Sequence, residues 1–363
     1  MKKNKNYVDL KDQPVPEGQH LLEVDDLKMY FHTEDGVVRA VDGVSYTLDR
    51  GETLGVVGES GSGKSVTAMT IMGLISMPPG KIEGGDVRYR GRSILEMTEE
   101  EMQHIRGNDI AMIFQDPMTS LNPVYKIGKQ VGEGLRLHRG YSKQEALKRA
   151  TELLDLVGIP EPEKRVNEYP HQFSGGMRQR VMIAMALACD PDILIADEPT
   201  TALDVTIQAQ IIELMQEMQQ KNGNAIIMIT HDLGVVADMA DKIMVMYAGR
   251  PVEFGTAEEI FYESRHPYTW GLIRSIPEQA IEEKKPLTPI HGNPPSLMNL
   301  PEGCVFSPRC PYATDKCRKQ RPERVVTESG HYSACHYSGE PEFLKNAPET
   351  SRTRKDSKKG GEA

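Results

Sequence analysis

A glycine-rich loop at residues 58–65 constrains the fold of this chain more than any other feature of the sequence. The segment Gly58–Ser65 fits the phosphate-loop pattern, which ends in glycine, lysine and a hydroxyl residue. It follows the apolar run Thr53–Val57 and precedes a segment, 66–75, with the composition of a helix. Glycines let backbone N–H groups surround phosphate oxygens, and the following helix points its positive end at them. The loop therefore predicts a nucleotide-binding α/β fold.

The last residues of this loop have predictable chemical roles. Lys64 would bring a positive charge to the β- and γ-phosphates, and the Ser65 hydroxyl would bind Mg²⁺. A nucleotide with Mg²⁺ is the predicted ligand. We expect its phosphates to contact Gly58, Ser60, Gly61, Ser62, Gly63, Lys64, Ser65 and Val66.

A second group of polar residues follows apolar runs farther along the chain. The run Ile193–Ala196 is typical of a buried parallel strand and leads directly into Asp197 and Glu198. Ligands bind at the carboxyl edge of such sheets, so we expect Asp197 to hold Mg²⁺, through water, and Glu198 to act as the general base for the attacking water. Gln115 and His231 also follow apolar runs and are candidates for the same edge.

A third glycine-containing segment, Phe173–Arg180, opens a predicted helix with Ser174, Gly175 and Gly176. A helix that begins this way offers another anion site. One nucleotide does not need two such sites in one chain. We therefore expect this segment to meet a nucleotide that another subunit holds.

Strand and helix patterns divide the chain into regions. Buried-strand patterns at 193–196, 225–229 and 243–246 alternate with helical patterns, which predicts an α/β core. Runs at 37–41 and 44–48 suggest two short strands separated by a turn at Asp42–Gly43. The predicted divisions are an N-terminal arm (1–20), an α/β core (21–262) with a helical subdomain (about 115–190), a proline-rich, loop-rich extension (263–340) and a disordered tail (341–363).

Composition excludes some classes of protein. The chain has 43 basic and 53 acidic residues, a net charge of −10, which disfavours non-specific binding to nucleic acid. Its longest apolar run, Val181–Cys189, is far shorter than the roughly 20 residues that a membrane-spanning helix needs. The N-terminus lacks the apolar stretch of a signal peptide, so a cytoplasmic location is expected.

Taken in order, these motifs resemble those of ATP-binding cassette (ABC) ATPases over about residues 21–262. Gly58–Ser65 corresponds to the Walker A loop, Ser174–Gly176 to the signature and Ile193–Asp197 to Walker B. The resemblance implies that each cassette gives its Walker loop to one nucleotide and its signature to the other, so that ATP binds between two cassettes.

The resemblance also assigns individual residues. It implies that Glu198 is the catalytic glutamate, that Gln115 is the Q-loop glutamine and a ligand of Mg²⁺, and that His231 is the switch histidine. Asp204, in the D-loop, would contribute to nucleotide binding. Phe31 is the expected aromatic that stacks on adenine, with Tyr30 as the rival.

Further segments, at 115–123, 198–206, 266–269 and 292–311, resemble the peptide/nickel importer subgroup. This resemblance implies ATP hydrolysis that powers peptide import at the cytoplasmic face of the membrane. The implied partners are a paralogous second ATPase subunit, two membrane permease subunits and an extracytoplasmic substrate-binding protein. Import of nickel or another small solute is the alternative. A soluble ABC ATPase of DNA repair or translation fits less well, because the chain has one cassette and no heptad run.

The cysteines form a separate pattern. Cys189 stands alone, whereas Cys304, Cys310, Cys317 and Cys335 are separated by five, six and seventeen residues. Four thiolates suit either a [4Fe–4S] cluster or a structural zinc ion, and zinc usually takes closer cysteine pairs. The resemblance also points to iron–sulfur, since some members of the subgroup carry such a cluster. Zinc and metal-free thiols remain the alternatives.

Overall fold

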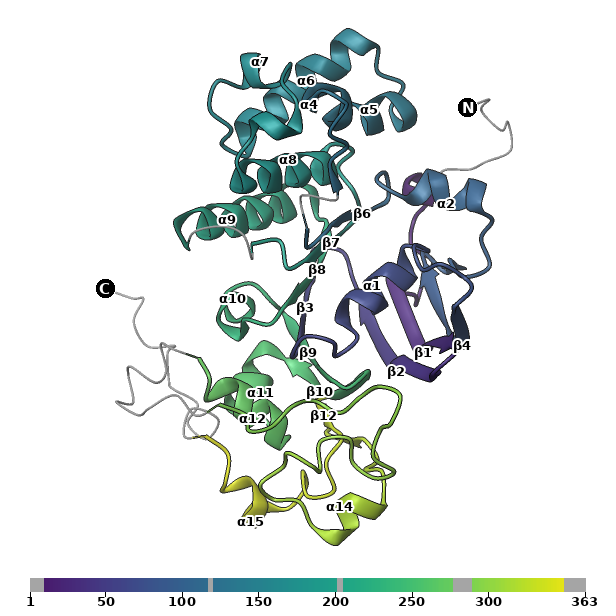
Figure 1. The fold of residues 1–363 in the computed structure, drawn as a ribbon, viewed down its shortest axis with the longest axis vertical. Helices are drawn as coiled ribbons and strands as arrows, with labels where there is room; N and C mark the ends of the chain where they lie inside the picture. Colours follow the sequence, from purple (N-terminus) through teal and green to yellow (C-terminus); the bar gives the residue numbers. More distant parts are fainter. Residues whose placement is uncertain (1–9, 117–119, 201–204, 277–288, 349–363) are drawn as a thin grey trace.

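The computed structural model describes residues 10–116, 120–200, 205–276 and 289–348. Two β-sheets organise this part of the chain (Figure 1). The larger has eight strands in the order β11-β12-β10-β9-β3-β8-β7-β6, and the smaller has four in the order β2-β1-β4-β5. The α/β class predicted from the alternation of strands and helices is confirmed.

The centre of the larger sheet is parallel. Its strands are β3 (Thr53–Val57), β6 (Ile110–Ile113), β7 (Ile193–Asp197), β8 (Ala225–Thr230) and β9 (Lys242–Tyr247). Every residue of β3, β6, β7 and β8 is buried, which explains why these strands read as unbroken apolar runs. The edge is antiparallel and comprises β10 (Arg250–Thr256), β12 (Tyr332–Ser333) and β11 (Val325–Val326).

The smaller sheet is antiparallel and contains β1 (Leu22–Thr33), β2 (Gly36–Leu48), β4 (Gly80–Tyr89) and β5 (Arg92–Ser93). The predicted turn at Asp42–Gly43 is wrong, because β2 runs through it. The hairpin turn lies earlier, where Thr33 pairs with Gly36. Gly43 has a φ of 86° and is the unpaired residue where the register shifts between Leu27 and Lys28 of β1, so the residues that suggested a turn form a bulge.

Helices flank the sheets, and Figure 1 places most of the predicted helical subdomain above one end of the larger sheet. The α-helices of the subdomain are α4 (Ile127–Val131), α5 (Glu133–His138), α6 (Lys143–Leu156), α7 (Pro162–Arg165) and α8 (Gly175–Leu187), and a 3₁₀ turn spans Pro170–Gln172. The others up to residue 262 are α1 (Lys64–Ile71), α2 (Glu99–Ile105), α9 (Val205–Asn222), α10 (Leu233–Ala237) and α11 (Ala257–Tyr262). No helix in the described ranges combines the length and apolar character that crossing a membrane requires.

The extension is attached to the core rather than separate from it. Its helices are α12 (Pro267–Ile273), α14 (Asp315–Lys319) and α15 (Pro341–Leu344). Strand β12 pairs with β10 and so enlarges the main sheet. Buried Val305 and Phe306 belong to the same apolar cluster as residues of β9 and β10. The loop-rich extension therefore shares a core with the ATPase region.

The described residues at both ends of the chain pack against the rest of the structure, although 341–348 belong to the segment predicted to be disordered. Leu10 is buried in the core, and the Lys11 ammonium donates to the carbonyl oxygens of Asn108 and Cys189 at 3.3 and 3.1 Å. At the other end, the Phe343 ring packs against Trp270 with centroids 5.3 Å apart. Part of the N-terminal arm and residues 341–348 are therefore folded. Residues 1–9 and 349–363 lie outside the described part.

A buried ion pair joins the two sheets. Asp192, just before β7, accepts a hydrogen bond from the Tyr89 hydroxyl at 2.7 Å and contacts the guanidinium of Arg90 at 2.5 Å. Arg50 binds the other carboxylate oxygen at 2.5 Å. The side chains of Arg90 and Asp192 are only 3% and 4% exposed, so neither charge has water as a substitute partner.

We predict that Asp192→Asn lowers the free energy of unfolding by about 3–5 kcal/mol, because it leaves the buried Arg90 charge unpaired. Chemical denaturation measures this change. The control is Asp155→Asn on the exposed side of α6, which should change stability by about 0.5 kcal/mol or less. Equal stability of the two variants would contradict the proposed importance of the pair.

Candidate active site

The glycine-rich loop lies between β3 and α1, as the sequence predicts. Gly58 has a φ of 152°, and a Cβ there would lie 2.2 Å from the Met246 carbonyl oxygen. Gly63 has a φ of 101°, and its Cβ would lie 2.3 Å from the Ala40 carbonyl oxygen. Both positions therefore require glycine, for backbone conformation and for space.

Lys64 is the first residue of α1 and lies beneath the loop. Its ammonium donates to the carbonyl oxygens of Gly58 at 2.6 Å and Glu59 at 3.0 Å. Burial lowers the pKa of Lys64, while the carboxylates of Glu198 and Asp197 act in the opposite direction. The charge is thus held inside the loop, where phosphate oxygens could replace the two carbonyl groups.

Ser65 and Asp197 form the pair expected for Mg²⁺. The Ser65 hydroxyl donates to Asp197 Oδ1 at 3.0 Å. Burial raises the pKa of the Asp197 carboxyl, the Ser65 bond opposes the rise, and the nearby Glu198 carboxylate adds to it. A hydroxyl and a carboxylate oxygen are hard ligands suited to Mg²⁺, so this pair fits the ion that accompanies a nucleoside triphosphate.

The sheet brings Gln115, Glu198 and His231 together. The Gln115 side-chain amide donates to Glu198 Oε2 at 2.9 Å, and His231 Nδ1 lies 3.2 Å from Glu198 Oε1. Glu198 adopts a left-handed φ of 47°, while its N–H donates to the Ile229 carbonyl oxygen of β8 at 2.9 Å. The two flanking side chains fix the orientation of the carboxylate, which suits a group that positions a water molecule.

Other loop residues offer groups to a phosphate. The Ser62 hydroxyl is buried and has no hydrogen-bond partner among the described residues. Ser60 and Gly61 are exposed, and Val66 packs partly against the core. A buried hydroxyl without a partner is costly unless a ligand binds it, so Ser62 fits the predicted phosphate contact.

The signature segment begins α8. Ser174 caps the helix by accepting the N–H of Met177 at 3.3 Å, and both Ser174 and Gly175 are exposed. A Cβ at Gly175 would meet nothing within 4 Å. Gly176 follows within the same first turn. This helix start is therefore open for an approach from outside the chain.

The predicted adenine contact remains a prediction. Phe31 and Tyr30 are both half-buried in β1, where Phe31 packs against the main core. The Tyr30 hydroxyl instead donates to Asp42 at 3.0 Å. Asp204 lies outside the described residues.

The four clustered cysteines line one small cavity of about 20 Å³. They are Cys304, Cys310, Cys317 and Cys335. Burial raises the pKa of Cys304, and it raises the pKa of Cys310 to about 11 and that of Cys335 to about 12. No group of three or more His, Cys, Asp or Glu side chains in the described ranges is arranged to hold a metal ion. The convergence fits the cysteine pattern, but the metal itself remains a prediction.

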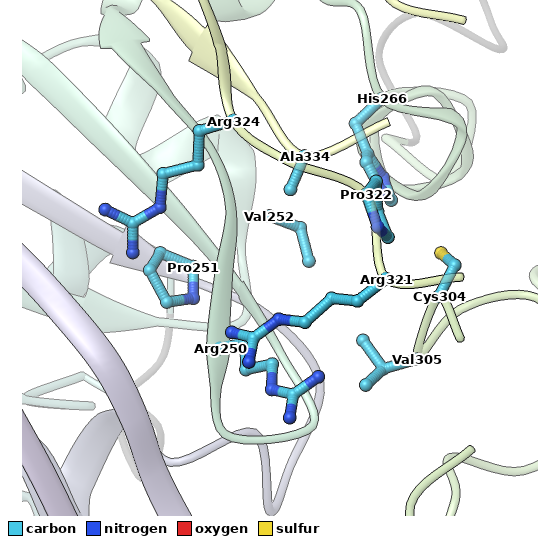
Figure 2. A pocket seen from close by; sticks show the side chains of 10 residues that line it. All are labelled: Arg250, Pro251, Val252, His266, Cys304, Val305, Arg321, Pro322, Arg324 and Ala334. Carbon is cyan, nitrogen blue, oxygen red and sulfur yellow. The ribbon is translucent and has the colours of Figure 1, made fainter. Parts of the chain in front are cut away.

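A second pocket lies between β10 and the extension (Figure 2). Arg250 of β10 bonds to the Asp42 carboxylate at 2.7 Å, and Arg321 of the extension approaches the same oxygen at 3.8 Å. Cys304 and His266 line this pocket as well as the cysteine cavity. The pocket therefore adjoins the cysteines and marks one place where the extension is fixed to β2.

Sequence reasoning missed a contact between the extension and the loop. The Arg309 guanidinium binds both carboxylate oxygens of Glu59, at 2.5 and 3.0 Å, and the Glu59 N–H donates to the Tyr268 hydroxyl at 2.8 Å. Tyr268 and Arg309 belong to segments that already carried the subgroup resemblance. Nothing in the sequence pairs either residue with a position more than 200 residues away.

Comparisons with known proteins identify the family of this chain. Residues 41–201 match the family described as ABC transporter, and residues 252–317 match the C-terminal region of oligopeptide/dipeptide transporters. Among solved structures, a dimeric post-hydrolysis state of the ATP-binding cassette MJ0796, bound to ADP and Pi, is similar. It has a TM-score of 0.60 and 28% identity, and the match covers 65% of this chain and 98% of that one.

Two curated relatives cover most of the chain. The oligopeptide transport ATP-binding protein OppD of Bacillus subtilis is 58% identical over 312 residues, or 86% of this chain and 87% of that protein. The dipeptide transport ATP-binding protein DppD of Escherichia coli is 52% identical over 317 residues, or 87% of this chain and 96% of that protein. The chain therefore belongs to the ABC transporter family, among its oligopeptide and dipeptide transport ATP-binding proteins.

Proposed function

We propose that this chain is the ATP-hydrolysing subunit of a peptide importer and that Glu198 carries the chemistry. The supporting observation is the position of the Glu198 carboxylate, between Gln115 and His231 and next to the Ser65–Asp197 pair. Glu198 would orient a water for attack on the γ-phosphate. Lys64 would bind the phosphates, and Mg²⁺, held by Ser65 and Asp197 with Gln115 nearby, would neutralise their charge.

Replacing Lys64 should affect ATP binding, whereas replacing Glu198 should affect hydrolysis. Lys64→Ala should lower ATP affinity by about a hundredfold or more, because it removes the buried charge for the phosphates. Glu198→Gln should keep ATP affinity within about threefold and lower turnover by about a hundredfold or more, because the loss affects the transition state. Nucleotide titration and phosphate release measure the two effects. Near wild-type hydrolysis by Glu198→Gln would refute the assignment.

A second cassette would complete the site. The exposed helix start at Ser174–Gly175 offers N–H groups to an anion that approaches from outside. We propose that it contacts ATP held by a paralogous partner subunit. Asp204 would lie at the same interface, and Phe31 would stack on the adenine.

The names of the two relatives favour peptides over nickel as the cargo. We place the chain at the cytoplasmic face of the membrane, with two permease subunits and an extracytoplasmic substrate-binding protein. No part of this assignment involves nucleic acid.

A groove in the helical subdomain is the proposed contact with a permease subunit. It encloses about 740 Å³ between α4, α6 and the segments around them. Its wall includes the exposed apolar side chains of Val124, Tyr125 and Leu147. The charged side chains among its described lining residues are all cationic: Lys126, Lys129, Arg136 and Lys143. A short amphipathic segment with acidic residues, on the cytoplasmic side of a permease subunit, would fit this groove.

Two exposed leucines of α6 test this contact. Leu147, 38% exposed, lines the groove, whereas Leu156, 48% exposed, does not. Leu147→Lys should weaken co-purification with the permease subunits by about tenfold, because it removes an apolar contact and places a charged ammonium group where the apolar side of the segment would pack. Leu156→Lys should leave assembly unchanged, and both variants should bind ATP normally. Equal assembly of the two variants would exclude the groove as the contact with a permease subunit.

We propose a [4Fe–4S] cluster at the four cysteines of the extension. Their convergence on one cavity supports this proposal. Burial raises the pKa of Cys304, Cys310 and Cys335, so thiolates there need cationic metal to stabilise them. When bound, the cluster would cross-link the loops of the extension. Zinc is the alternative, although a single ion needs its sulfurs closer together than a cluster does.

Anaerobically purified protein should be brown and contain about four irons per chain. Cys317→Ser should remove the colour and expose residues 300–336 to protease. The control is Cys189→Ser. Cys189 lies in the apolar cluster around α8, which contains none of the four cysteines, so this variant should leave the iron content unchanged. Colourless protein with one zinc ion would show that the cysteines bind zinc rather than a cluster. Metal-free protein with an equally protected extension would refute both the cluster and the zinc ion.

A further inference from the structure

Every polar group of Glu59 is occupied in this structure. The backbone N–H donates to the Tyr268 hydroxyl at 2.8 Å, and the carbonyl oxygen accepts from the Lys64 ammonium at 3.0 Å and from the Ser62 N–H at 3.2 Å. The carboxylate is bound by Arg309 through both oxygens. Glu59 lies within the phosphate loop, so these bonds fix the conformation of the loop from the side of the extension.

Arg309 is itself held firmly. Its side chain is 4% exposed and donates to the carbonyl oxygens of His291 at 2.9 Å and Ile290 at 3.2 Å. It also donates to the Tyr247 hydroxyl at 3.3 Å. The bond to Glu59 raises the pKa of the Arg309 guanidinium above its ordinary value. The planar, bidentate geometry is one that lysine cannot reproduce.

Direct neighbours of these residues form part of the wall of the cysteine cavity. Arg309 precedes Cys310, and the Phe306 ring lies 5.4 Å from that of Tyr268 and 5.2 Å from that of Tyr247. Phe306 and Cys310 line the cavity. The extension is therefore linked to the phosphate loop through a short set of direct contacts.

We propose that Arg309 is a positioning residue for ATP, which acts by holding Glu59 and neutralising its carboxylate. Without the guanidinium, a negative charge would stand uncompensated in the loop that must bind the negative phosphates. The loop would also lose its attachment to the extension. Arg309 would thus govern how tightly ATP binds, whereas the hydrolytic step at Glu198 would be unaffected. This inference rests on ATP binding at Lys64, as proposed above.

The test is a double-mutant cycle, with Mg²⁺·ATP binding measured on the full chain and steady-state ATPase kinetics measured on the chain assembled with its partner cassette. Arg309→Gln should weaken ATP binding and raise KM by about tenfold, while kcat changes by less than about twofold. Glu59→Gln should weaken binding by less than about threefold. The combined variant should bind ATP about as well as Glu59→Gln alone, because removal of the carboxylate removes the repulsion.

Two further variants separate positioning from folding. Arg309→Lys should recover part of the lost affinity through charge alone, without the second hydrogen bond. Arg318→Gln is the matched control, because Arg318 lies in the same extension beside Cys317, is 59% exposed and bonds to Asp315. It should leave KM unchanged.

Three outcomes would overturn the proposal. These are wild-type ATP affinity in Arg309→Gln, an equal loss in Arg318→Gln, and a loss in Arg309→Gln that Glu59→Gln does not relieve. If the proposed ATP site at Lys64 is itself wrong, Lys64→Ala will bind ATP as well as the wild type does. That result differs from each of the three outcomes above.

Discussion

The parallel hydrogen bonding of four neighbouring strands is the constraint on which the active site depends. Strands β3, β8, β7 and β6 lie side by side in one register, so their carboxyl ends meet at one edge. The phosphate loop follows β3, His231 follows β8, Asp197 ends β7, and Gln115 lies just beyond β6. Residues separated by up to about 170 positions in sequence therefore converge because of backbone pairing, before any side-chain contact is considered.

Burial gives this edge its electrostatic character. Lys64, Asp197 and Glu198 are close enough to influence one another: burial lowers the pKa of the lysine, and burial together with the nearby Glu198 carboxylate raises the pKa of Asp197. Charges held in such a site are poorly solvated, so each gains from a partner of opposite sign. A nucleotide with Mg²⁺ brings both signs, phosphates for Lys64 and a cation for Asp197. The buried charges of the site are thus better neutralised with this ligand than without it.

Sequence patterns predicted those features that depend on local periodicity. The buried strands and the helix after the phosphate loop are both confirmed. The patterns failed where a distant partner decides the structure. Asp42–Gly43 reads as a turn but is held in β2 by pairing with β1. The sequence around Phe343 predicts disorder, yet the Phe343 ring packs against Trp270, and Leu10 of the N-terminal arm is buried in an apolar cluster with distant residues. The Glu59–Arg309 pair spans 250 positions and leaves no local signal.

The extension is best understood as part of the nucleotide-binding region. It adds β12 to the main sheet, contributes to the core under β9, and binds the region at two charged contacts: Arg309 with Glu59 and Arg321 near Asp42. The first lies in the phosphate loop, and the second lies in β2 beside the strand that carries Phe31. The cysteine cavity adjoins both contacts, through Cys310 next to Arg309 and through Cys304 in the pocket of Figure 2. Any group that binds these cysteines would therefore stabilise the segments that hold the phosphate loop, even though it touches no nucleotide.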